Sequence, residues 1–181
     1  MYENYPFWFT FFNELGFRVV LSPVSNRKVY ELGIDSIPSE SECYPAKLAH
    51  GHVQWLINNG IHTIFYPSIP YERNEFAEAN NHYNCPIVTS YPENIKNNID
   101  AIVHGEVDFL HPFISFASED TISYRLVDEL SGKFHIPADE IKKATHTAWE
   151  ELAACRKDMQ KKGEETVSYT HLRAHETTLH L

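Results

Sequence analysis

The sequence predicts an α/β fold: a Rossmann-like, mostly parallel sheet flanked by helices, followed by a C-terminal helical appendage. Three observations support this prediction. Short apolar stretches alternate with helix-like stretches as far as about residue 115. Hydrophobic residues make up 43% of the 181 residues, which is enough for a buried core. After Ser118 the apolar residues recur only at helical spacing.

The alternation is defined by apolar runs and by the Gly and Pro residues that close them. Helices are predicted over residues 5–15, 27–32, 45–58 and 92–99. Gly16 and Gly33 follow two of these helices, as expected of residues that end a helix. Strands are predicted over residues 17–21, 62–66, 86–89 and 107–110. Strands separated by helices indicate parallel pairing, with helices covering both faces of the sheet.

Three segments are expected along the chain. Residues 1–115 form an α/β module that carries two of the cysteines; it begins inside an aromatic helix, so its first strand is expected to be missing. Residues 116–165 form a helical segment, with one helix from 118 to about 134 and a longer one from Pro137 to about 162. Residues 166–181 resemble translated adapter read-through, with a polar tail as the alternative, and they are excluded from the fold prediction.

Composition and charge exclude several classes of function. The formal net charge is −10 and the Lys and Arg residues are dispersed, which argues against a nucleic-acid surface. No apolar run is long enough to cross a membrane, and the N-terminus has no secretion signal. Three cysteines are too few for a disulfide framework, so a reduced, cytoplasmic protein is expected.

Cys43 is the first candidate for chemistry. It lies among polar residues just before the helix predicted to begin at Pro45, with Tyr44 as the expected cap. The positive end of a helix dipole lowers the pKa of a thiol and favours a metal-binding or nucleophilic thiolate. Lys47 and His50 are three residues apart and share a helix face near this position. The alternative is an inert cysteine beside a helix start.

Cys85 is the second candidate. It follows a long polar segment, residues 68–84, which includes His82, and Pro86 fixes the chain direction after it. The alternative is a cysteine at the start of a strand. With a strand at 86–89, Cys85 lies by default at the opposite sheet edge from Cys43, and the sequence leaves open whether the two share a site. Cys155 lies inside a regular helix, where packing or simple exposure explains it.

Other chemistries have weaker signals. A structural zinc site needs four ligands in close Cys or His pairs, and no C-x-x-C is present. A site formed by Cys43, His82 and Cys85 has no recognised spacing. A thiol hydrolase lacks a nucleophile motif, and no glycine loop for phosphate is found among the 7 Gly.

Several segments resemble the acyl-CoA dehydratase activase-related family, whose members include a module similar to 2-hydroxyacyl-CoA dehydratase subunits. The resemblance extends over about residues 1–165 and is most specific in two stretches, Cys-Tyr-Pro-Ala-Lys-Leu at 43–48 and His-Tyr-Asn-Cys-Pro at 82–86. It also covers residues 1–10, 17–23 and 65–67.

The resemblance implies an iron–sulfur module, with a cluster of the 4Fe-4S type, in ATP-coupled low-potential electron transfer linked to 2-hydroxyacyl-CoA dehydration. It implies Cys43 and Cys85 as metal ligands, Lys47, His50 and His82 as residues near the cluster, and an ATP-driven activator and an acyl-CoA as partners. The relatives need a third cysteine, expected beyond this chain, and Ser68 stands after a strand where a ligand could be placed. The alternative is a non-catalytic scaffold domain that docks an activator or dehydratase subunit through its aromatic N-terminal helix and acidic surface.

Overall fold

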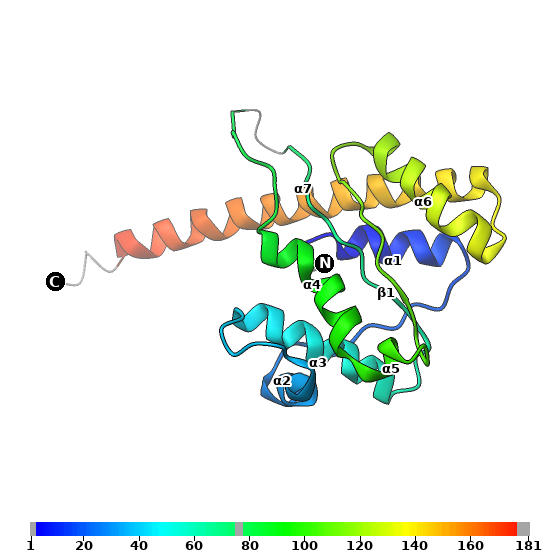
Figure 1. The fold of residues 1–181 in the computed structure, drawn as a ribbon. Helices are drawn as coiled ribbons and strands as arrows, with labels where there is room; N and C mark the ends of the chain where they lie inside the picture. The colour runs from blue at the N-terminus through cyan, green and yellow to red at the C-terminus, as the bar shows by residue number, and fades with distance from the viewer. Residues whose placement is uncertain (1–2, 75–77, 177–181) are drawn as a thin grey trace. The chain divides into compact units, whose positions relative to one another are not determined.

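The computed structural model describes residues 3–74 and 78–176, with side chains described as far as residue 167. The chain divides into two compact units. The first comprises Met1–Arg18 together with Asp139–Leu181, and the second comprises Val19–Ala138. Figure 1 shows the helices and strands that make up each unit.

The first unit is built from helices α1, Tyr5–Glu14, and α7, Ala138–Glu176. Phe7, Trp8 and Phe11 of α1 are buried. The ring of Phe7 lies edge-on to Trp149 of α7, with 6.5 Å between the centroids. Gly16 follows α1 with a φ of +80°, a conformation that glycine adopts without strain. The predicted aromatic helix and its glycine stop are therefore confirmed.

Helix α7 is longer than the sequence predicted. Its buried residues recur at helical spacing near the beginning: Ile141, Ala144, Ala148 and Leu152. The backbone remains helical past the predicted end near 162 and through residues 166–176. These are part of the segment for which read-through was predicted, and residues 177–181 of that segment lie outside the described residues.

The second unit contains a parallel pair of strands, β1 (Thr63–Phe65) and β2 (Asp108–Leu110). Thr63 pairs with Asp108, and a bridge between Ser68 and Phe113 continues the pairing in the same register. Both strand predictions in this part of the chain are confirmed, since residues 62–66 and 107–110 contain them.

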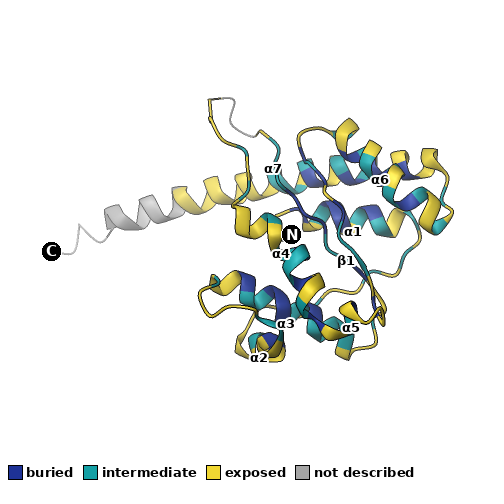
Figure 2. Ribbon diagram, in the orientation of Figure 1, coloured by how far each residue is buried: buried dark blue, intermediate teal, exposed yellow. Residues whose placement is uncertain are grey.

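Three helices pack with this strand pair: α3 (Tyr44–Asn58), α4 (Pro86–Asn98) and α5 (Asp100–Val103). Their apolar side chains form one buried cluster with the strands, made of Ala49, Val53, Ile64, Ile95, Ile99, Ile102 and Val107. Tyr66 and Tyr91 pack against this cluster from its edge. Figure 2 shows the buried faces of α3 and α4 and the exposed first turn of α4.

A close helix crossing fixes α3 against α2 (Arg27–Gly33), which is followed by a 3₁₀ turn at Ile34–Ser36. Gly33 and Gly51 meet at the crossing, and a Cβ on Gly51 would overlap the carbonyl oxygen of Val29. Helix α6, Glu119–Phe134, begins after Ser118, whose Oγ accepts a hydrogen bond from the Thr121 N–H at 3.2 Å. The predictions for α2, α3 and α6 are confirmed to within a few residues.

Two strand predictions are wrong. Residues 17–21 are not part of any strand, because they join the two units and no described strand pairs with them. Residues 86–89 form the first turn of α4, although Ile87, Val88 and Thr89 are β-branched. The described residues therefore form a mainly helical structure with a two-stranded parallel sheet. This agrees with the α/β class but is not a clear Rossmann fold.

Candidate functional site

The two candidate cysteines are the N-cap residues of two neighbouring helices. Cys43 precedes α3 with an extended backbone, and Cys85 precedes α4 with a φ of −52° and a ψ of 133°; each helix has a proline in its first two positions. The Cys43 carbonyl accepts from the Lys47 N–H at 3.2 Å, and the Cys85 carbonyl accepts from the Thr89 N–H at 3.1 Å. The cap predicted at Tyr44 is therefore displaced by one residue, to Cys43.

Chain connectivity brings both helix N-termini to the same edge of the strand pair. Helix α3 ends just before β1, so it runs back along the strand and begins at the carboxyl edge of the sheet. Helix α4 begins after β1, at that same edge. Both helices appear side by side in Figure 1. The default placement of Cys85 at the opposite edge depended on a strand at 86–89 and is wrong, because that segment is helical.

Tyr91 connects the two thiols. Its hydroxyl lies 3.7 Å from the Cys43 sulfur, within hydrogen-bonding distance for sulfur. Burial raises the pKa of the Tyr91 phenol, and its hydrogen bond to Cys43 and the charges of the Cys43 and Cys85 thiols raise it further. Tyr91 therefore stays protonated and can donate to a thiolate. Cys43 and Cys85 are both close enough to influence one phenol.

Both thiols lie at the start of a helix and are open to solvent. Both cysteines are free and exposed, and neither side chain caps its own helix. The unpaired N–H groups and the dipole at each helix start attract negative charge. A pair of thiolates at adjacent helix N-termini can bind a thiophilic metal or act as nucleophiles.

A polar network connects α3 with α4 below the thiols. The Asn94 side-chain amide donates to Glu42 Oε1, one residue before Cys43. His50 is buried, and its Nδ1 lies 2.9 Å from the Ser36 hydroxyl. Burial lowers the pKa of His50, and Glu42 partly opposes this shift. These contacts fix the loop before α3 relative to α4 and so fix the relative positions of the two cysteines.

The other predicted site residues each make a different contact. Lys47 donates to the Glu40 carbonyl at 2.7 Å and so closes the loop before Cys43. His50 is buried, and its ring contacts the Ser36 hydroxyl. The half-buried ring of His82 lies edge-on to Tyr71, with 5.8 Å between the centroids. Their proximity to a cluster remains a prediction. Cys155 lies within α7, which belongs to the first unit.

Ser68 lies beyond the end of β1 and is fully buried. Its backbone pairs with the β2 side through the Pro112 and Ile114 backbones, at 2.9 Å each. Its hydroxyl has no hydrogen-bond partner in the structure. An unpaired buried hydroxyl costs free energy, so its presence calls for an explanation.

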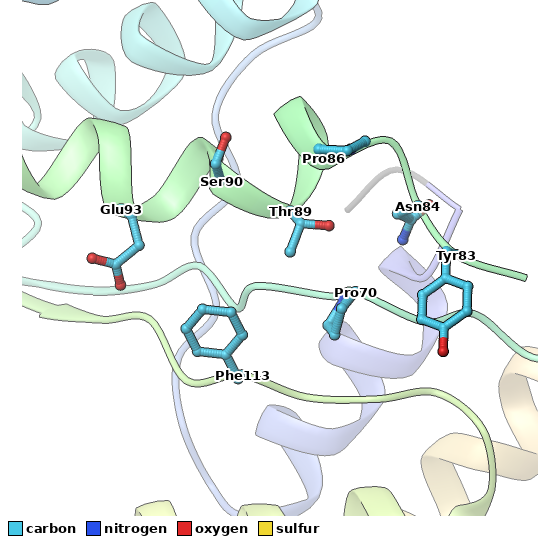
Figure 3. A pocket seen from close by; sticks show the side chains of 8 residues that line it. All are labelled: Pro70, Tyr83, Asn84, Pro86, Thr89, Ser90, Glu93 and Phe113. Atoms are coloured by element: carbon cyan, nitrogen blue, oxygen red, sulfur yellow. The ribbon is translucent and has the colours of Figure 1, made fainter.

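A groove of about 500 Å³ opens beside Cys85. Figure 3 shows its two sides, with Thr89 and Glu93 of α4 extending toward Pro70 and Phe113, while Ser90 points away from them. Tyr83, Asn84 and Pro86 complete its lining. Glu93 Oε1 and His111 Nδ1 lie 2.6 Å apart, next to the mostly apolar surface of this groove.

Three or more His, Cys, Asp or Glu side chains are not gathered into a metal-binding group anywhere in the part of the chain that the structure describes. Cys43 and Cys85 therefore lack a third ligand of these types among the described residues.

Sequence reasoning missed Tyr91, Glu42 and Asn94, because their roles depend on contacts between helices. It also missed the helical start at Pro86. The signal was present: a proline directly after Cys85 is typical of the first position of a helix, as Pro45 near Cys43 is. The β-branched residues after Pro86 favoured the wrong choice.

The fold and site define a helix-rich α/β protein with a thiol pair at two helix N-termini. The model of the CoA enzyme activase uncharacterised domain matches residues 1–180, and the chain belongs to that family. The predicted activase-related resemblance is thereby confirmed. No curated protein and no solved structure matches the chain.

The described helices were also compared with the length and hydropathy that a membrane span requires. Within residues 3–74 and 78–176, no helix is both long and apolar enough to cross a bilayer.

Proposed function

We propose that Cys43 and Cys85 hold an iron–sulfur cluster, of the 4Fe-4S type, in an activase-related protein that takes part in ATP-coupled low-potential electron transfer. The transfer would be linked to 2-hydroxyacyl-CoA dehydration, with an ATP-driven activator and an acyl-CoA as partners. The observation that carries this proposal is the placement of both cysteines as N-caps of adjacent helices beside Tyr91.

The residues present fit such a group. Thiolates are the ordinary ligands of iron–sulfur clusters, and both thiols are free and exposed. The helix N-termini favour the negative charge that ligation requires. Tyr91 can donate a hydrogen bond to the Cys43 sulfur, and such bonds tune the potential of a cluster. The bound cluster would supply one-electron chemistry, while Glu42 and Asn94 hold the two ligands in position.

Two thiolates leave further iron positions without a protein ligand. The remaining ligands would come from another segment of the full-length protein, from a partner subunit, or from a residue other than His, Cys, Asp or Glu. One open iron position also suits the binding of a substrate oxygen.

The scaffold alternative depends on the aromatic N-terminal helix and the acidic surface, and cysteines at opposite sheet edges would favour it. Phe7, Trp8 and Phe11 of that helix are buried, so they offer little surface to a partner. The two cysteines share one edge of the strand pair, which favours the cluster over a purely structural docking role.

Anaerobic reconstitution of the full chain with iron and sulfide tests the proposal. The wild-type protein should bind both elements and show the broad visible absorption of a cluster. Cys43→Ser and Cys85→Ser should each abolish most of this absorption. Cys155→Ser is the matched control and should leave the absorption unchanged, because Cys155 lies in the interior of helix α7 and not at a helix N-terminus.

An unchanged spectrum in both Cys43→Ser and Cys85→Ser would refute the ligand assignment. A loss equal to theirs in Cys155→Ser would show that iron binds to thiols without regard to their position.

A further inference from the structure

We propose that the Ser68 hydroxyl oxygen is a third ligand to the iron of the group held by Cys43 and Cys85. This inference rests on the function proposed above. Coordination uses a lone pair of the hydroxyl oxygen, so the step needs no oxidant or reductant. Such a bond would give a partner to the Ser68 hydroxyl, which has no hydrogen-bond partner in the structure.

The first argument is the burial of Ser68. Its exposed fraction is 0%, and its Oγ has neither a protein hydrogen-bond partner nor access to solvent. Leaving a buried hydroxyl unpaired costs about 1–3 kcal/mol. Alanine would fill nearly the same space without this cost, and a bond from the hydroxyl oxygen to a ligand would remove it.

The second argument is the direction of the Ser68 side chain. The pairing from Thr63–Asp108 to Ser68–Phe113 keeps one register, so the chain alternates without a bulge. Ile64, Tyr66 and Ser68 therefore point to the same face. Ile64 belongs to the cluster with α3 and α4, and Tyr66 packs against that cluster. Ser68 is the next residue on this face towards the edge where both helices begin.

The third argument is a direct connection to Cys85. The carbonyl of Ile69, adjacent to Ser68, accepts a hydrogen bond from the Asn84 side-chain amide at 2.9 Å and from the Thr89 hydroxyl at 3.4 Å. The Asn84 backbone N–H also donates to the Pro70 carbonyl at 3.0 Å. Asn84 and Thr89 lie on either side of Cys85, so the chain at Ser68 is tied to the N-terminus of α4.

The fourth argument is the position of Tyr91 between the Ser68 face and Cys43. Tyr66, on the Ser68 face, and Tyr91 pack against the same core cluster, and the Tyr91 hydroxyl lies 3.7 Å from the Cys43 sulfur. Tyr66 and Tyr91 thus connect the Ser68 face with the thiols. In the described part of the chain no His, Cys, Asp or Glu completes the ligand set, which leaves the Ser68 oxygen as the candidate for the third position.

The test is anaerobic iron–sulfide loading of the wild-type chain, Ser68→Ala and Ser68→Cys, read by iron content, visible absorption and electron paramagnetic resonance. Ser68→Ala should bind less than half of the wild-type iron. Ser68→Cys should restore loading with a shifted spectrum, because sulfur replaces oxygen as the ligand. Ser115→Ala is the matched control, since Ser115 lies on the neighbouring extended segment and accepts only from the Ala117 N–H.

A second readout uses no bound iron. In the metal-free protein, Ser68→Ala should unfold at the same or a higher urea concentration than wild type, because an unpaired hydroxyl has been removed. In the loaded protein the order should reverse. A purely structural role for Ser68 would destabilise the variant in both states.

Wild-type iron content and spectra in Ser68→Ala would overturn the Ser68 assignment and leave the Cys43 and Cys85 assignment intact. Identical spectra for loaded Ser68→Ala and Ser68→Cys would also overturn it. If the wild-type chain binds no iron, the proposed function fails together with this inference.

Discussion

Helix α3 is held in two different ways along its length. Around Gly51 it touches α2 backbone to backbone, and any side chain larger than hydrogen would collide with Val29. At Cys43 the same helix presents an exposed thiol, hydrogen-bonded to Tyr91 across a distance of 3.7 Å. The first region has no space for a larger side chain, whereas the second leaves a thiol exposed to solvent. The tight packing at the crossing of α2 and α3 fixes the position of α3. The candidate site lies at the N-terminus of the same helix, where the Cys43 side chain is exposed.

The largest effect is expected from Gly51→Ala. The new Cβ would overlap the Val29 carbonyl oxygen, and its carbonyl carbon would lie only 2.7 Å away. Overpacking of this kind costs about 3 kcal/mol or more when backbone must move. Urea unfolding should show this loss. Gly132→Ala in α6 is the matched control, with open space around the new Cβ, and should be neutral or stabilise slightly. Equal stabilities for the two variants would contradict the tight crossing.

A smaller loss in the free energy of unfolding is expected from a substitution in α4. This helix also has a tightly packed position and an exposed one. Ile95 has an exposed fraction of 0% and belongs to the core cluster, whereas Ile87 in the first turn is 45% exposed. Ile95→Ala should lower the free energy of unfolding by about 2–4 kcal/mol, and Ile87→Ala by less than about 1 kcal/mol. Denaturant titration of both variants measures the difference. Comparable losses would show that the first turn is packed as tightly as the middle of α4.

A weaker effect should appear in the pH dependence of stability. Burial lowers the pKa values of His50 and His52 in the folded protein, so the unfolded chain binds protons first as the pH falls. The free energy of unfolding should therefore be highest above the usual histidine pKa of 6.5 and decline below it. His50→Gln should flatten this decline in the metal-free protein. Unfolding curves with the same pH slope in both proteins would count against the buried histidine.

The smallest change in stability is expected at the thiols. Cys43 and Cys85 are exposed, so Cys43→Ser and Cys85→Ser should each alter the free energy of unfolding of the metal-free protein by less than about 0.5 kcal/mol. Their effect should appear only in iron binding. Thermal unfolding of the metal-free variants measures this. A loss comparable to that of Ile95→Ala would mean that the cysteines serve the fold rather than a ligand.

Local sequence cues were sufficient where one segment determines its own structure. The aromatic helix with its stop at Gly16, the helix from Pro45, and the helix begun by Ser118 were all predicted from caps and apolar spacing. The same local cues led to wrong strand predictions at residues 17–21 and 86–89. An apolar run becomes a strand only when another strand pairs with it, and a helix start at a proline overrides the β-branched residues that follow.

The candidate site shows the same division. Cys43 and Cys85 stand out in the sequence because their polar surroundings and nearby prolines are local features. Glu42, Asn94 and Tyr91 do not, because each acquires its role through a contact with a residue some fifty positions away. Ser68 was noticeable only by its position after a strand. Its complete burial and unpaired hydroxyl are properties of the packed structure.

The sequence by itself determined most of the helical segments and singled out two thiols as candidates for chemistry, since capping, helical spacing and polarity act within a few residues. Only the tertiary structure decided that the thiols share one edge. That result depends on α4 beginning directly after Cys85 and on α3 running back along β1, so that two helix N-termini meet where the strands end. Such a meeting is a consequence of chain direction in space, which no local pattern of residues contains.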